Sequence, residues 1–116
     1  QRLIRKLCPF CRKRVRVKKE MIPDSFKNLL LGEDEDGIRL FKAGGCEHCQ
    51  SGYRGRTVIA EILDFDEDIR DMVASGKLDQ LRNKWKEKAY LTLEQDATML
   101  ILKGLTSIEE AERILG

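Results

Sequence analysis

Apolar residues in the first half of the chain change from helix-like to strand-like spacing. Three of them fall at positions i, i+3 and i+4: Phe26, Leu29 and Leu30. Pro23 precedes this group and Gly32 follows it as a stop signal, so the sequence predicts one short helix here. Segments 38–42 and 57–63 are rich in Ile, Val, Leu and Phe, and we expect them to be two strands of a β-ribbon.

The second half of the chain has helical spacing throughout. Four apolar stripes follow one another: Ile69, Met72 and Val73; Leu78, Leu81 and Trp85; Ala97, Leu100 and Ile101; and Ala111, Ile114 and Leu115. Capping residues separate them: Asp66 before and Gly76 after the first, Gly104 after the third, and the capping-box pairs Thr92 with Gln95 and Ser107 with Glu110. No stripe can be buried by its own helix, so we expect a bundle of about four short helices, with Trp85 in its core.

These patterns predict an α+β fold that is mainly α. Residues 1–63 form a small β-ribbon with a short helix, and residues 64–116 form a helical C-terminal subdomain. We expect the two to pack together as one unit. A chain of 116 residues has a modest core, so a bound metal would add to its stability.

Charge is distributed unevenly, although the net charge is only +2. Residues 1–19 contain nine basic residues and no acidic ones, whereas acids cluster at 33–36 and 64–71. A basic segment can bind nucleic acid or anionic lipid, but the simpler interpretation is a solvated surface around a thiolate-bound metal. No apolar run approaches the roughly 18 residues of a membrane helix, and the N-terminus lacks the apolar region of a signal peptide.

All four cysteines lie in the first subdomain, as two Cys-x-x-Cys pairs. Cys8 and Cys11 form the first pair, and Cys46 and Cys49 form the second, with 34 residues between the pairs. Two such knuckles fill the four positions of a tetrahedral Zn²⁺ and leave none for water, so the predicted site is structural. The lone histidine, His48, is then expected to be an exposed residue of the knuckle and not a ligand.

Three other uses of the cysteines are weaker. Disulfides need an oxidising compartment, and nothing in the chain indicates export. The "CPFC" tetrad resembles a redox site but lacks a surrounding βαβ pattern. An iron–sulfur cluster also accepts four cysteines and remains an alternative to zinc.

The segment "GYRGRT" after the second knuckle does not match a phosphate-binding loop. Its glycines are three apart, Arg stands where Lys belongs, and a strand follows where a P-loop needs a helix. We expect Gly52 and Gly55 to turn the chain away from the metal and Tyr53 to pack on the knuckle, with Arg54 and Arg56 reaching solvent or an acid. No Ser/His/Asp set is present, so the chain alone does not resemble an enzyme.

Three segments resemble the C-terminal region of type II secretion ATPases (the E component) and type IV pilus extension ATPases: "QRLIRKLCPFC", "GCEHCQSGYRGRTVIAEIL" and "GLTSIEEAERIL". In that family the region follows a RecA-like ATPase core, and its cysteine pairs bind zinc. The resemblance implies zinc-ligand roles for Cys8, Cys11, Cys46 and Cys49. It also implies a cytoplasmic homo-hexamer docked on inner-membrane platform proteins, which couples ATP hydrolysis to secretion or pilus extension.

The Walker motifs of that family are absent from this sequence. The resemblance therefore implies a non-catalytic accessory fragment, with ATP and Mg²⁺ bound only by the missing core. Its expected contacts are with neighbouring subunits or platform proteins. The alternative function is a stand-alone zinc ribbon that binds nucleic acid, motivated by the basic segment but opposed by the low aromatic content of 6%.

Overall fold

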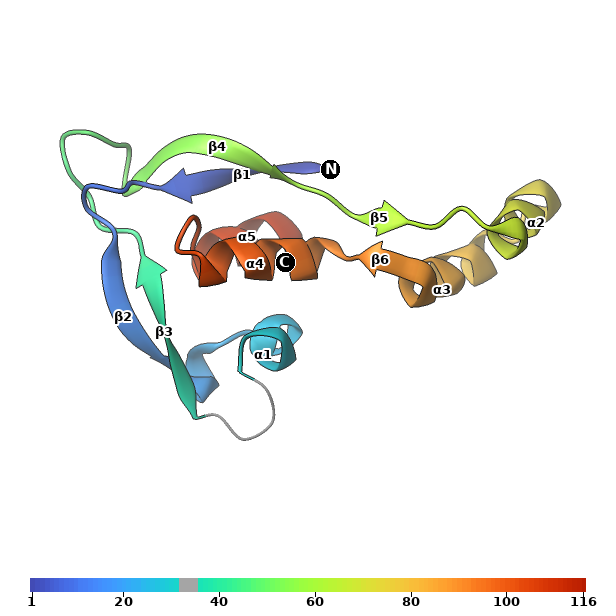
Figure 1. The fold of residues 1–116 in the computed structure, drawn as a ribbon, viewed down its shortest axis with the longest axis horizontal. Coiled ribbons are helices and arrows are strands. Elements are labelled where there is room, and N and C mark those ends of the chain that lie inside the picture. The colour runs from blue at the N-terminus through green and yellow to red at the C-terminus, as the bar shows by residue number, and fades with distance from the viewer. Residues whose placement is uncertain (32–35) are drawn as a thin grey trace.

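Two antiparallel strand pairs meet at one corner of the molecule, where the loops that carry the cysteines lie (Figure 1). The computed structural model describes residues 1–31 and 36–116. The strands are β1 (Arg2–Leu7), β2 (Lys13–Lys18), β3 (Gly37–Lys42), β4 (Tyr53–Ile59), β5 (Ile62–Leu63) and β6 (Ala89–Leu91). The helices are α1 (Asp24–Leu30), α2 (Glu67–Ser75), α3 (Leu78–Lys88), α4 (Leu93–Leu102) and α5 (Ile108–Leu115), with a 3₁₀ turn at Lys19–Met21. These elements confirm the predicted α+β class; the predicted stop at Gly32 lies outside the described residues.

The strand pairing differs from the ribbon expected from the sequence. The two predicted strands do not pair with each other, because β3 pairs with β2 and β4 pairs with β1. Both partners lie in the basic segment, where Val15 and Val17 alternate with cations and form a strand with one apolar face. The predicted strand at 57–63 is divided at Ala60, whose backbone N–H donates to the Asp96 carboxylate at 2.9 Å instead of continuing the ladder.

The hydrophobic core joins residues from both predicted subdomains. Its buried members are Ile4, Ile22, Phe26, Leu30, Leu31, Leu40, Ile59, Ala97, Ile101, Ile108 and Ala111. Helices α4 and α5 lie between the two ribbons and α1, so the C-terminal residues complete the core of the N-terminal ones (Figure 1). The boundary between residues 63 and 64 remains a prediction.

The helices after residue 64 are arranged as two pairs. Helices α4 and α5 belong to the main body, whereas α2 and α3 pack on each other at the end of an arm formed by β5 and β6 (Figure 1). Within α2 and α3, Ile69 and Leu81 are buried. Trp85 is 40% exposed, so its predicted place in the core is wrong. The residue is exposed because α3 is covered mainly by a single neighbouring helix.

The helix starts follow the predicted caps, with one correction. Asp66 accepts a hydrogen bond from the Ile69 N–H at 3.0 Å, and Thr92 and Gln95 form the complete capping box. Ser107 accepts from the Glu110 N–H at 3.1 Å, but the Glu110 side chain turns away from the helix start. The second capping box is therefore only half formed. No helix of the described residues is long and apolar enough to span a bilayer.

Gly104, after α4, provides the first testable prediction. Its φ is +75°, and a Cβ there would lie 2.6 Å from a Phe41 ring carbon and 2.7 Å from Nη1 of Arg12. Gly76 has a similar φ of +70° but open space around it. Both alanine variants bear the left-handed backbone cost, but only Gly104→Ala adds a clash. We expect Gly104→Ala to lower the free energy of unfolding by about 1–3 kcal/mol more than Gly76→Ala in urea titrations. Equal losses would contradict this packing.

Candidate metal centre

The four cysteines lie in two loops that meet at the corner of the ribbons. Cys8 and Cys11 lie between β1 and β2, and Cys46 and Cys49 lie between β3 and β4. The Cys8 N–H donates to the Gly52 carbonyl at 2.9 Å, which ties the first loop to the end of the second. As predicted, the chain turns there at Gly52, whose φ is +93°. Gly55, which was also predicted to turn the chain, instead lies within β4 at the irregularity in its pairing with β1, with a φ of +77°.

The sulfur atoms form one compact group. All four Sγ atoms lie within 4.8 Å of one another. Three of the Sγ–Sγ distances are 3.7 Å: Cys8 to Cys46, Cys11 to Cys49, and Cys46 to Cys49. Metal–sulfur bonds of about 2.3 Å in a tetrahedron place the sulfurs about 3.8 Å apart, so the four thiols could hold one metal ion of that geometry.

The thiols have unequal acidities. A backbone hydrogen bond from His48 lowers the pKa of Cys46, but burial and the other three thiols raise it to about 12 in total. Burial raises the pKa of Cys49, but hydrogen bonds from the backbone of Cys46 and Gly52 and from neighbouring thiols lower it to about 7. Protons and a metal ion therefore compete for the sulfur atoms of the cluster. A divalent cation at its centre would favour the thiolate form of all four, which makes metal binding dependent on pH.

An exposed stack of side chains covers the outside of the knuckles. Phe10 is 64% exposed, its ring centroid lies 4.9 Å from that of His48, and the Arg54 guanidinium lies 5.4 Å from the Phe10 ring. His48 is exposed, as predicted for a residue between two ligands. The guanidinium of Arg12, which follows the first knuckle, lies 4.1 Å from the Phe41 ring.

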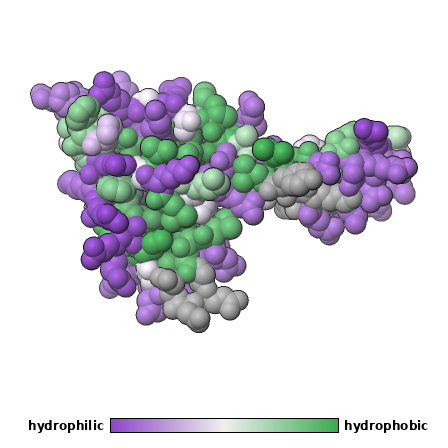
Figure 2. Space-filling view, in the orientation of Figure 1, coloured by the Kyte–Doolittle hydropathy of each residue, from purple (hydrophilic) through white to green (hydrophobic). Residues whose placement is uncertain are grey.

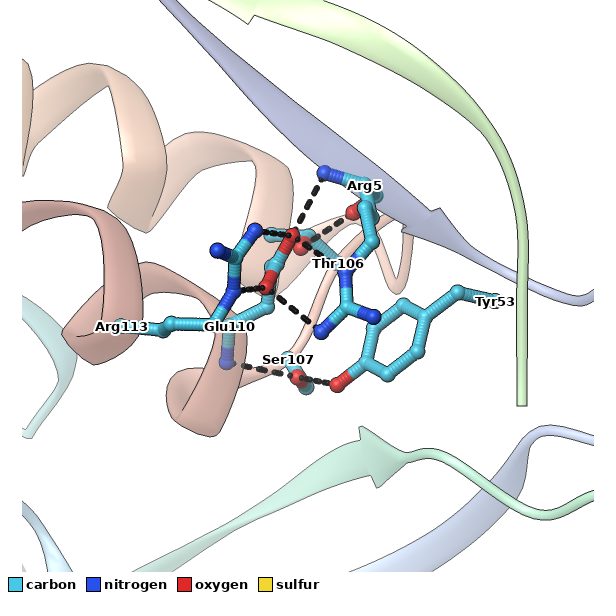
Figure 3. A network of polar contacts seen from close by, with 6 residues as sticks. All are labelled: Arg5, Tyr53, Thr106, Ser107, Glu110 and Arg113. Carbon is cyan, nitrogen blue, oxygen red and sulfur yellow. Dashed lines mark hydrogen bonds and ion pairs between the residues drawn. The ribbon is translucent and has the colours of Figure 1, made fainter. Parts of the chain in front are cut away.

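A buried carboxylate on α5 forms an ion-pair network that the sequence did not reveal. Glu110 is 1% exposed, and Figure 3 shows it between two arginines. Its oxygens accept from the Arg5 N–H at 2.8 Å, from Arg5 Nε at 2.9 Å and from Arg113 Nε at 2.6 Å. Burial raises the pKa of Glu110, but the hydrogen bonds from Arg113 and Arg5 outweigh this and lower it to about 2. The carboxylate is therefore charged at neutral pH.

The same network fixes the strand that leads to the first cysteine. The Tyr53 hydroxyl and Ser107 Oγ lie 2.6 Å apart, and the Arg5 guanidinium lies 4.2 Å from the Tyr53 ring (Figure 3). Thr106 Oγ1 donates to the Arg5 carbonyl at 2.9 Å. Arg5 precedes Cys8 by three residues, so α5 holds β1 in place immediately before the cluster. Tyr53, predicted to pack on the knuckle, takes part in this network.

Comparison with known protein families finds a match over residues 1–113 to the family described as Type II/IV secretion system protein. A type IV pilus assembly ATPase PilB of Thermus thermophilus is 38% identical over 113 residues, which are 95% of this chain and 12% of the relative. A type II secretion system protein E of Pseudomonas aeruginosa is 34% identical, over 98% of this chain and 22% of the relative. A protein transport protein HofB homolog of Escherichia coli is 34% identical, over 100% and 24%. The chain thus spans between about an eighth and a quarter of the length of these relatives.

Proposed function

The chain belongs to the Type II/IV secretion system protein family, and from that premise we propose that it is a non-catalytic, zinc-binding accessory domain of a hexameric secretion or pilus-assembly ATPase. Two of the relatives described above are named as components of type IV pilus assembly and type II secretion. Because this chain matches less than a quarter of their length, we assign ATP and Mg²⁺ binding to the rest of the protein. The second candidate, a stand-alone nucleic-acid binder, has no support from the family match.

The observation that carries the proposal is the group of four sulfurs within 4.8 Å. We assign Cys8, Cys11, Cys46 and Cys49 as the ligands and Zn²⁺ as the ion. Four thiolates close the tetrahedral shell and leave no position for a substrate, so the metal would serve structure and not catalysis. Zinc is also redox-inactive, which suits a site that links two loops permanently.

The proposed role of the ion is to hold two ribbons at a fixed angle. The β1–β4 pair is anchored to the core by Ile4 and Ile59, and the β2–β3 pair is anchored by Leu40. A metal at the corner joins the loops between these pairs (Figure 1). The charged outer surfaces would then be presented rigidly to neighbouring subunits or to platform proteins at the cytoplasmic side of the inner membrane.

Metal analysis of the purified chain tests this proposal. We expect about one zinc per chain by inductively coupled plasma mass spectrometry, because the four thiols form one closed site. We also expect no phosphate release from ATP above background. A folded chain with no metal and four freely reactive thiols would contradict the metal assignment, and bound iron would favour a cluster instead.

The accessory role requires the complete motor. We expect deletion of residues 8–49 from the full protein to impair assembly or transport, and to weaken the recovery of platform proteins in pull-downs. If assembly and transport remain intact after this deletion, the region is dispensable and the proposed role is wrong.

A further inference from the structure

The outer side of the β2–β3 pair carries four cations. In its register Arg14 lies opposite Phe41, Arg16 opposite Arg39, and Lys18 opposite Gly37. Cross-strand partners share a face, and Val17 on the other face packs against the core. The outward residues Arg14, Arg16, Lys18 and Arg39 are exposed, and we call them the cationic face. Figure 2 shows hydrophilic surface along this side of the molecule.

This face is electrostatically unfavourable in an isolated chain. Arg16 and Arg39 are direct cross-strand partners, an arrangement of like charges that destabilises a two-stranded sheet. Among the residues that the structure describes, no acidic side chain forms an ion pair with any of the four cations. An anionic partner would relieve this repulsion, so the face is suited to docking.

Single-stranded nucleic acid is not the partner that this face favours. Single-stranded nucleic acid binds through cationic grooves combined with aromatic rings on which bases stack. The aromatic residue of the face, Phe41, already has the Arg12 guanidinium at 4.1 Å and that of Arg14 at 5.8 Å. The ring is therefore occupied, and the chemistry that remains is that of guanidinium groups toward carboxylates and phosphates.

A carboxylate-rich surface is present on the same chain. Residues 61–71 contain six acidic residues and one basic residue: Glu61, Asp64, Asp66, Glu67, Asp68 and Asp71, with Arg70. All of these except Asp66 are exposed, and Glu67 and Asp71 stand four residues apart on α2. Their rise along the helix is about 6 Å, close to the roughly 6.6 Å between alternate residues of a strand such as Arg14 and Arg16.

The two surfaces cannot meet within one chain. Helix α2 and the β2–β3 pair lie at opposite ends of the molecule, whose longest extent is 54 Å (Figure 1). We propose that the acidic segment 61–71 of one copy docks on the cationic face of the next copy. Each copy offers one surface of each kind, so the contact either closes reciprocally in a two-fold dimer or repeats head-to-tail into a ring or a filament. The inference deepens the proposed role in subunit contacts, and closure into a ring rests on that proposal.

Charge exchange between the two surfaces tests the contact. One variant carries Arg16→Glu and Arg39→Glu, and the other carries Glu67→Lys and Asp71→Lys. Sedimentation velocity of the zinc-loaded wild type should show association that increases between about 10 µM and 1 mM and weakens with salt. Each variant alone should associate at least about tenfold more weakly, because the meeting surfaces have like charge. An equimolar mixture of the two should regain association, as should a chain that carries all four changes.

A matched control reverses two exposed cations elsewhere, Arg56→Glu and Lys103→Glu, and should associate like the wild type. A wild-type chain that is monomeric at 1 mM, or a mixture that fails to regain association, overturns the proposed contact. Binding of the wild type to duplex DNA or to phosphatidylglycerol vesicles through the cationic face, without self-association, overturns it in favour of those partners. Zinc content measured on the same samples distinguishes the proposed zinc site from the proposed contact between copies. A zinc-loaded chain that stays monomeric contradicts only the contact.

Discussion

Cys46→Ser is expected to abolish stoichiometric zinc binding and to lower the free energy of unfolding by more than about 4 kcal/mol, since the binding energy of a structural metal is folding energy. A hydroxyl is a poor zinc ligand, and the loss of the Cys46 thiolate opens the fourth position of the metal to water. The corner between the two ribbons then loses its cross-link. The measurements are zinc content and urea unfolding, followed by circular dichroism and Trp85 fluorescence.

The helical signal should fall only in part, because helices α2 and α3 pack on each other away from the cluster. His48→Ser is the matched control: it changes a residue between two ligands and should keep the metal. If Cys46→Ser retains full zinc and full stability, the assignment of that ligand is wrong. If His48→Ser loses the metal, the four-thiolate shell is wrong.

Glu110→Gln is expected to lower the free energy of unfolding by about 2–4 kcal/mol at pH 7, because removing one charge of a buried ion pair leaves its partners uncompensated. We expect less than the full cost of a buried charge, since the side chains of Arg5 and Arg113 are 38% and 55% exposed and stay hydrated. Glu109→Gln changes the exposed neighbour and should shift stability by less than about 0.5 kcal/mol. Urea titration of the zinc-loaded variants measures both, and equal effects would contradict the buried network.

The pH dependence of this difference is a second arm of the same experiment. Glu110 has a folded-state pKa lowered to about 2 from the ordinary value of 4.5, so the unfolded chain takes up the proton first as pH falls. The stabilisation is thus complete above pH 4.5 and is lost as pH falls toward 2. The difference in the free energy of unfolding between the wild type and Glu110→Gln should therefore become smaller over that pH range. Protons also compete with zinc for the thiols at low pH. This competition affects both chains equally, so it cancels when their free energies of unfolding are subtracted.

Local patterns were the part of the structure that the sequence could predict. The caps at Asp66 and Thr92 depend on residues within three positions, and both are formed. The Cys-x-x-Cys pairs are equally local, and the structure brings the two pairs together. Strands β1 and β2 were not predicted from the sequence. Their alternation of apolar and polar positions is short and is interrupted by cations, and their partner strands lie far away in the sequence.

The ion-pair network around Glu110 could not be predicted from the sequence for a different reason. Glu110 stands three residues after Ser107, which is the spacing of a capping box, and the sequence offers no sign that Arg5 lies beside it. The two requirements compete for one buried carboxylate, and its contacts with the two guanidinium groups prevail because charged hydrogen bonds are stronger than a cap. Trp85 is the opposite case, a residue that was predicted to be buried and is exposed. An apolar stripe predicts which face of a helix is buried, but not whether a second element covers the whole of that face.

The contact between the first strand and the last helix also joins two segments that are synthesised far apart in time. The Arg5–Glu110 contact joins residues 105 positions apart. A nascent chain can pair β1 with β4, and can bring its four thiols together, before α5 has been translated. Until then the charge on Arg5 lacks its carboxylate and the core lacks Ala111, so a metal corner that formed during synthesis would form on an incomplete body. Zinc that binds at this stage would hold the ribbons in register while the ribosome delivers the helix that locks them.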